Sequence, residues 1–387
     1  MTKKRSSSKN STSPWLGILR VLGLALTVVT IMGFVLLLAV PYIHPEHVRR
    51  LAWIGLGMPF VVYAMWVWLV VWMVARERSA WVILAVALLV TFPIWRRTVV
   101  MNFGGNYPSK EAIAKGHELK ILTYNIEMFS EYNNADSILD IIEEGNYDIV
   151  CLQEFGHYSN TDSKWKNVKQ RLDEMYEHRH IWYKNQSSHS ENGLVLFSHH
   201  PIVNKVKVKY NSLYNITVYS DVKVGDDTIR IFNNHLESNK LTRRDRTVAE
   251  EMQDENVDYK TNYRSLRRVL AKIADASIIR ASQADSISAI IAETPYPVIV
   301  LGDFNDVPQS YAYTKLIGSK HLNSDASFTD AYAAAGAWLY YRTYNQNHLD
   351  VPIDHILVSD EFDVMSCEIL PQEFSDHYPV TATLLLK

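Results

Sequence analysis

Uncharged apolar runs fill the first hundred residues of the chain. Residues 21–40 and 51–75 contain no charged side chain, and residues 79–95 form a third, shorter uncharged run. About 20 apolar residues in a helix span the hydrocarbon core of a bilayer. A buried hairpin of core helices is the alternative interpretation, but a helix on a soluble protein needs a polar face. The pattern therefore predicts a transmembrane region over residues 1–100 with about three helices.

The remainder of the chain alternates between short β-branched runs and amphipathic stretches, which indicates an α/β domain over residues 119–387. Strands are predicted at residues 119–124, 149–153, 194–197, 216–222, 229–233, 298–301, 355–358 and 380–386. Helices are predicted at residues 135–144, 164–176 and 263–292. Residues 101–118 contain Gly104, Gly105 and Pro108 and have the composition of a linker.

Basic residues suggest how the chain crosses the bilayer. Lys3, Lys4, Arg5, Lys9 and Arg20 favour a cytoplasmic N-terminus, because positive residues are retained on the inner side. The first apolar run is longer than the usual core of a signal peptide and lacks a small-residue cleavage pattern, so we expect it to be retained. Three spans place the second domain outside the cytoplasm.

Two pairs of basic residues oppose this topology. Arg49-Arg50 and Arg96-Arg97 then lie on the outer side. Cys151 and Cys367 are the only cysteines, and they give no disulfide framework that would decide the compartment. We expect a multi-pass protein of a bacterial inner or plasma membrane with its soluble domain on the extracytoplasmic side.

Net charge separates the two halves of the chain. Residues 1–110 carry +10, from twelve Lys/Arg and two Asp/Glu, whereas the whole chain carries −3, so residues 111–387 carry −13. An acidic domain lacks the overall electrostatic footprint of a duplex-binding protein. A local basic patch interleaved with acidic residues is still present. Its members are Lys240, Arg243, Arg244, Arg246, Lys260, Arg264, Arg267, Arg268 and Lys272.

Polar side chains with catalytic chemistry stand at the ends of the predicted strands. Each could be a turn former or an ordinary histidine when taken alone. Their repetition at strand ends is how a rigid scaffold presents a site. The segments are TYNIE (123–127), CLQEF (151–155), NGLVLFSHHPI (192–202), NNHLES (233–238), GDFND (302–306), IDHILVS (353–359) and SDHYPV (375–380).

These seven segments, in this order, resemble the endonuclease/exonuclease/phosphatase superfamily. The resemblance covers residues 119–387 and implies a four-layered α/β sandwich of two mixed β-sheets flanked by helices. It also implies a phosphoester hydrolase in which water attacks phosphorus in line, with a hard cation and hydrogen-bond donors stabilising the charge that develops. Mg²⁺ or Mn²⁺ is the expected cofactor, because the candidate ligands are oxygen atoms.

The roles follow from chemistry and from the family's motifs. Asp303 and Asn305 are expected to align the attacking water, and His377, oriented by Asp354, to donate to the phosphate. His235 is a second donor or the acid for the leaving oxygen. The metal ligands implied by the resemblance are Asn125, Glu154 and Asp376. Two further positions, Asn192 and Arg280, would contact phosphate or brace the site, as would Gln283 beside Arg280.

The sequence leaves the substrate open. A membrane-anchored phosphodiesterase for a lipid head group or small phosphoester fits the apolar runs and the acidic domain, and an extracytoplasmic nuclease for DNA or RNA fits the basic patch. A non-catalytic binding protein is disfavoured by the complete set of polar residues, and a transporter by the lack of charge within the apolar runs. No protein partner is predicted, only the substrate and the bilayer.

Overall fold

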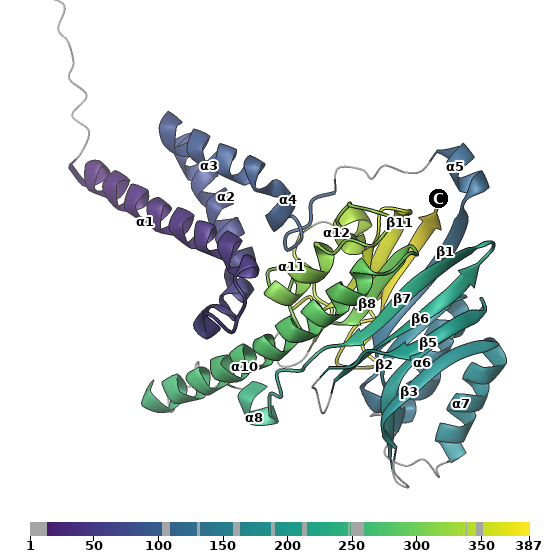
Figure 1. Cartoon of the computed structure of the whole chain (residues 1–387). Helices are drawn as coiled ribbons and strands as arrows, with labels where there is room; N and C mark the ends of the chain where they lie inside the picture. The colour runs from purple at the N-terminus through teal and green to yellow at the C-terminus, as the bar shows by residue number, and fades with distance from the viewer. Residues whose placement is uncertain are drawn as a thin grey trace, which may run out of the picture.

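Two six-stranded mixed β-sheets form the centre of the larger half of the protein, shown in Figure 1. The first sheet has the order β11-β12-β1-β2-β4-β3, with bounds Phe362–Ile369, Val380–Leu386, His117–Asn125, Ile149–His157, Glu191–Ser198 and His178–Gln186. The second has the order β5-β6-β7-β8-β10-β9, with bounds Ile202–Lys207, Ile216–Val224, Asp227–His235, Val298–Asp303, Asp354–Val358 and Thr329–Asp330. This computed structural model describes residues 14–102, 109–129, 132–157, 163–186, 190–210, 215–246, 248, 259–337, 339–345 and 351–387.

The two sheets pack face to face with helices on their outer sides, which confirms the predicted four-layered sandwich. Side chains such as Ile121 and Ile299, from one sheet each, share a buried core between the sheets. Outside the first sheet lie α6 (Tyr132–Gly145) and α7 (Ser163–Met175). Outside the second lie α10 (Tyr259–Ala292) and α11 (Tyr311–Ile317). Shorter helices are α5 (Lys110–Lys115), α8 (Arg243–Arg246) and α12 (Ala331–Ala335).

Every strand predicted from the sequence is present, and the four that were missed are the outermost strands of the two sheets. They are β3, β5, β9 and β11. An edge strand has solvent beside it and often carries charged residues that discourage pairing with another chain. β5 (IVNKVK) is mostly exposed, and β3 (HRHIWYKNQ) contains basic and polar residues throughout. Neither has the continuous apolar run that marks a central strand.

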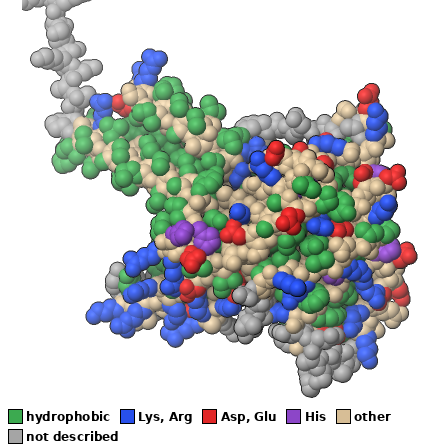
Figure 2. Space-filling model, in the orientation of Figure 1, with side chains coloured by type: hydrophobic (Ala, Val, Ile, Leu, Met, Phe, Trp, Pro, Cys, Tyr) green, Lys and Arg blue, Asp and Glu red, His purple; other side chains and the backbone are tan. Residues whose placement is uncertain are grey.

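The N-terminal region forms a separate group of helices with an apolar outer surface. They are α1 (Pro14–Ala39), α2 (Met58–Val74), α3 (Arg78–Val90) and α4 (Phe92–Trp95). Figure 2 shows hydrophobic side chains over much of this region, and Phe60, Val74 and Leu89 are each at least three-quarters exposed. Burying such side chains in hydrocarbon is favourable, whereas water around them is costly.

Two segments of this region have the length and composition of membrane spans, namely Trp15–Tyr42 and Arg49–Val74. A signal sequence and a buried core helix meet the same criteria. The second predicted helix begins later than expected, because the structure has short 3-10 turns at Arg49–Leu51 and Ile54–Gly57 before α2. The third is divided, since the helix ends at Val90 and a new one starts at Phe92, next to Pro93.

The helical group packs against the α10–α12 side of the sandwich. Arg49 forms an ion pair of 2.6 Å with Asp275 of α10. A Cβ on Gly55 would lie 2.5 Å from the carbonyl oxygen of Gln309, so only glycine permits this approach. At the other end of the group, Val100 pairs with Leu339 through backbone hydrogen bonds of 3.1 and 2.8 Å. The predicted linker lies partly at residues 103–108, outside the described residues.

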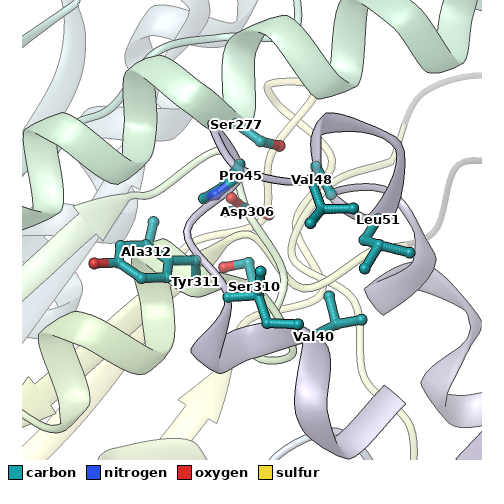
Figure 3. A pocket seen from close by; sticks show the side chains of 11 residues that line it. Val40, Pro45, Val48, Leu51, Ser277, Asp306, Ser310, Tyr311 and Ala312 are labelled. Carbon is teal, nitrogen blue, oxygen red and sulfur yellow. The ribbon is translucent and has the colours of Figure 1, made fainter. Parts of the chain in front are cut away.

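The connection between α1 and α2 also covers a polar spot on the sandwich. Figure 3 shows a small cavity with Ser277, Asp306 and Ser310 on one side. Val48 and Leu51 form its other side. The cavity has a volume of about 10 Å³, about enough for one water molecule. The N-terminal region therefore lies against the loop that follows β8.

Candidate active site

Three strands of the second sheet place polar side chains side by side. His235 at the end of β7 pairs with Asp303 at the end of β8, and Asp303 pairs with Asp354 at the start of β10. β7 and β8 are parallel whereas β10 is antiparallel, so two strand ends and one strand start meet at the same edge. This register explains why residues far apart in the sequence form one row.

The first sheet contributes Asn125 from the end of β1 and Glu154 from an irregular point within β2. Asn125 Nδ2 donates a hydrogen bond of 3.0 Å to Asp303 Oδ2, which joins the two sheets at the site. The pairing of β2 with β4 is interrupted around Glu154, whose φ is +51°. Glu has no special tolerance for this left-handed conformation, and such strained residues gather at functional sites. The interruption directs Glu154 toward His235, with Oε1 3.7 Å from Nε2.

A buried polar network directly below the site fixes the distance between the two sheets. Gln153 Nε2 of β2 donates to Asn233 Oδ1 of β7 at 2.7 Å. Asn233 Nδ2 donates in return to the carbonyl oxygens of Leu152 and Val195, at 3.3 and 2.9 Å. Because each amide precedes a site residue on its own strand, this network positions both. Neither amide was predicted as a site residue, although Gln153 lies in CLQEF and Asn233 in NNHLES.

His377 is held by Asp354 and faces Asp303. Its Nδ1 lies 2.8 Å from Asp354 Oδ2, and its Nε2 lies 3.8 Å from Asp303 Oδ2 and 4.0 Å from Asp376 Oδ1. A carboxylate at Nδ1 fixes the ring so that Nε2 is the free donor. Burial alone would lower the pKa of His377, but the negative charges of Asp354 and Asp303 outweigh burial and raise it well above its usual value. The two neighbouring carboxylates therefore favour the protonated form of His377.

The GDFND segment shapes the centre of the site. Gly302 has φ +119° and lies so close to the Asn234 backbone that a Cβ would be 2.2 Å from its carbonyl oxygen. Asn305 has φ +52°, a conformation that Asn tolerates, and its Nδ2 donates to Asp303 Oδ2 at 3.1 Å. Burial raises the pKa of Asp303 to about 6, with His377 opposing the rise. The backbone conformations of Gly302 and Asn305 thus bring the Asp303 carboxylate and the Asn305 amide together.

An open cleft of about 420 Å³ leads to these groups. It is lined by Glu154, Lys184, Asn192, Asn215, His235, Ser238 and Lys240. Asn192 therefore lies in the cleft, as a substrate contact requires. Lys184 was missed because it belongs to edge strand β3. Burial lowers its pKa, and the charges of Glu154 and Glu237 oppose that effect. The cleft thus has cationic side chains on its wall above an acidic floor.

Arg280 and Gln283 lie beneath the site. The Arg280 guanidinium is buried and donates to Asp306, Asn239 and Ser277 and to the Glu237 carbonyl, at 2.8 to 2.9 Å. Gln283 accepts a hydrogen bond of 2.9 Å from the Glu237 backbone. These contacts favour a bracing role for Arg280 in holding the loop after β8. A direct contact of Arg280 with phosphate stays an untested prediction.

A family model decides the classification. The model for the endonuclease/exonuclease/phosphatase family matches residues 122–377, about two-thirds of the chain. The chain belongs to this family. Residues 19–98 match a second model, for a domain of unknown function. No curated protein sequence matches the chain.

Three solved structures to which the chain is similar are proteins with different names. A Beutenbergia cavernae endonuclease/exonuclease/phosphatase is 17% identical over 70% of this chain and 72% of its own, with a TM-score of 0.49. A humanized D. rerio TDP2 is 14% identical over 69% and 98%, with a TM-score of 0.48. Sphingomyelinase C from Streptomyces griseocarneus is 15% identical over 69% and 99%, with a TM-score of 0.47.

As a member of this family, the chain is a hydrolase of phosphoric ester bonds. Enzymes of the family generally use divalent metal ions and act on phosphoesters such as nucleic acids or lipids. The structure offers a site with suitable chemistry. Asp303, Asp354 and His377 present ligand atoms within 4.8 Å of one another.

The donor set around this group fits a hard cation. Glu154 and Asp376 extend the group through their contacts with His235 and His377, so that four carboxylates meet two imidazoles. Within the described part of the chain, Asp354 Oδ1 is buried and has no hydrogen-bond partner. Oxygen ligands carrying excess negative charge suit Mg²⁺ or Mn²⁺ better than a soft metal.

Proposed function

We propose that the chain is a membrane-anchored, divalent-metal-dependent phosphodiesterase acting on a lipid head group or another small phosphoester at the bilayer surface. One structural observation is the main support for the proposed reaction. Side chains from both sheets form an unbroken series of contacts of 4.0 Å or less, running from Glu154 through His235, Asp303 and His377 to Asp376. Such a series brings acid, base and metal-ligand groups to one point, as phosphoester hydrolysis requires.

Asp303 and Asn305 are the residues that orient the attacking water. Asp303 accepts the proton of that water, and the amide of Asn305 keeps the carboxylate oriented through its 3.1 Å hydrogen bond. His377 donates from Nε2 to a non-bridging phosphate oxygen, while Asp354 prevents the ring from turning. His235 stands on the Glu154 side of Asp303, where it protonates the leaving oxygen.

Glu154, Asp376 and Asn125 are the residues that would hold Mg²⁺ or Mn²⁺. When bound, the cation supplies a Lewis acid that neutralises charge on the phosphate and its leaving oxygen. Asn125 can serve because its amide oxygen is at the site, where it also accepts a 3.2 Å hydrogen bond from the Glu127 backbone. The hydrogen bond from Asn125 to Asp303 couples the ligand set to the base.

The docked helices support the membrane part of the proposal. The loop between α1 and α2, like the segment after α4, contacts the sandwich, whereas Arg20 of α1 pairs with Glu77, before α3, at 2.8 Å. The helical group therefore has one end at the catalytic domain and the other end away from it. With the N-terminus in the cytoplasm, the catalytic domain lies outside. Lys3, Lys4, Arg5 and Lys9, on which that orientation depends, lie outside the described residues.

A cysteine label tests this topology. Asp325 has a fully exposed side chain, whereas the native Cys151 and Cys367 are buried. Asp325→Cys in intact cells should react with a membrane-impermeant maleimide, with the wild-type chain as the control. Labelling that needs permeabilised cells would place the catalytic domain in the cytoplasm.

Nucleic acid is the second candidate substrate, because several basic residues lie along α10. A panel decides between the two. Purified full-length chain with Mg²⁺ is incubated with phospholipid vesicles, single- and double-stranded oligonucleotides and a chromogenic phosphodiester. We expect cleavage of the phospholipid and of the small diester. Oligonucleotide cleavage without lipid cleavage would replace our proposal by a nuclease, and no turnover of any diester would remove it.

A further inference from the structure

A cavity at the foot of the apolar helices combines positive charge with aromatic rings. It has a volume of about 640 Å³ and lies between the α1–α2 connection and the first half of α10. It is lined by Arg49, Arg50, Trp53, Tyr263, Arg267, Leu270, Ala271 and Ala274. Figure 2 shows Lys and Arg side chains gathered beside α10, next to the apolar helices. None of these lining residues has a part in the proposed chemistry.

Two of the three arginines at this cavity have no carboxylate partner among the described residues. Arg49 is paired with Asp275 at 2.6 Å. For Arg50 and Arg267, by contrast, no carboxylate within 4.0 Å is found among the described residues, and both side chains are exposed. Within the part of the chain that the structure describes, these two guanidinium groups are therefore available to an anion.

Two basic residues on an adjacent face of α10 differ, because a buried carboxylate pairs with both. Arg268 and Lys272 both pair with Asp245, at 2.8 and 2.6 Å. Burial would raise the pKa of Asp245, but hydrogen bonds from Lys272 and Thr242 hold it below its usual range. Two charges of the predicted basic patch are therefore neutralised by Asp245, whereas Arg267 of the same patch has no carboxylate partner among the described residues.

The lining has the amphipathic character of a membrane interface. Tyr263, Arg267, Leu270 and Ala274 recur at spacings of four, three and four residues, so they share one face of α10. Trp53 faces them from the α1–α2 connection. Trp and Tyr are enriched where hydrocarbon meets the head groups, and basic residues next to a span attract anionic lipids. Small residues on the same face leave room for a lipid's glycerol and first methylenes.

We infer that this cavity binds an anionic phospholipid of the surrounding bilayer, with its phosphate between Arg50 and Arg267. The inference rests on the proposed membrane anchoring but not on the identity of the substrate. A lipid held here ties α10 to the bilayer, and α10 also carries Arg280, which braces the loop after β8. The site is separate from the catalytic cleft and serves to orient the domain.

Lipid binding to the intact chain tests the inference. Detergent-solubilised full-length protein in EDTA is titrated with phosphatidylglycerol, phosphatidylcholine, inorganic phosphate and a single-stranded oligonucleotide, and bound ligand is counted by native mass spectrometry. The variants are Arg50→Gln/Arg267→Gln, the charge-keeping Arg50→Lys/Arg267→Lys, and a control, Lys205→Gln/Lys223→Gln, which removes two exposed charges from β5 and β6. EDTA prevents turnover, so the result does not depend on catalysis.

We expect phosphatidylglycerol to bind in preference to phosphatidylcholine and to phosphate. The Gln pair should weaken binding about tenfold or more, the scale for two juxtamembrane cations, whereas the Lys pair and the control should retain it. Unchanged affinity in a folded Gln pair overturns the inference. So does loss of the lipid on Glu154→Gln, which would place it in the catalytic cleft. Oligonucleotide binding that depends on the same arginines, without lipid preference, would make this a nucleic-acid surface.

Discussion

The N-terminal helices and the catalytic sandwich arrange polar and apolar side chains in opposite ways. The helices keep a modest core around Met65 and Leu84 and turn side chains such as Phe60 outward. The sandwich buries its apolar side chains between the layers and brings charged ones, such as Asp303, to the strand ends. The second arrangement suits water, whereas an exposed apolar surface such as that of the helices is costly there.

The difference assigns separate tasks to the two regions. A buried carboxylate is costly unless it is paired, so the cluster of Asp303, Asp354 and His377 indicates a function. An exposed apolar surface is costly in water, so the outer face of α1 and α2 indicates a hydrophobic environment. The two regions meet where Arg49 and Gly55 contact the sandwich. The predictions below ask whether the tasks can be separated.

The largest effect is expected at the strand ends. Asp303→Asn and His377→Ala should each lower kcat on a small phosphodiester about 10³-fold or more, because both act on the transition state. Asp227→Asn, at the exposed opposite end of β7, is the matched control and should keep its rate. Near-normal turnover of a folded Asp303→Asn would show that this carboxylate is not the base. Circular dichroism monitors the fold in each variant.

A smaller effect should follow removal of the helices. A chain starting at Lys110 should hydrolyse a soluble phosphodiester at the full-length rate, since every assigned catalytic residue lies beyond that point. On phospholipid vesicles at low enzyme concentration it should be about tenfold slower or more, because tethering raises the effective concentration. Equal rates of both chains on vesicles would contradict a lipid substrate. The cut uncovers Gln309 and Tyr311, so melting temperature is recorded in parallel.

Core strands and site residues were predictable because each is local in the sequence. An apolar run followed by Asn125 or Asp303 contains both the strand and the group that it presents. The edge strands, with Lys184 on one of them, were not predictable. An edge strand has no neighbouring strand on one side, so it can carry polar residues and lacks the apolar run that marks a central strand. The docking of Gly55 on Gln309 joins segments about 250 residues apart, and no local pattern records such a contact.

The smallest effect concerns stability of the sandwich in acid. His180 of β3 lies between the sheets with Nδ1 2.8 Å from Ser220 Oγ, and burial lowers its pKa to about 4. The unfolded chain, with an ordinary histidine pKa near 6.5, therefore binds more protons between these values. The contribution of neutral, buried His180 to the free energy of unfolding is therefore complete above pH 6.5 and is lost as the pH falls toward 4. Urea unfolding at pH 7 and pH 5 measures how much unfolding free energy the chain loses in acid. This loss should be smaller in His180→Gln than in the wild-type chain. An equal loss in both chains would mean that other groups cause it.

The most direct test of a metal-dependent site at the strand ends is a Mg²⁺ titration of phosphodiesterase activity after chelation. The wild-type chain should be inactive in EDTA and recover fully with Mg²⁺ or Mn²⁺. Glu154→Gln should need about tenfold or more Mg²⁺ for half its activity, because it loses a charged ligand. Full activity of the exhaustively chelated wild-type chain, or identical Mg²⁺ curves for both chains, would contradict the account.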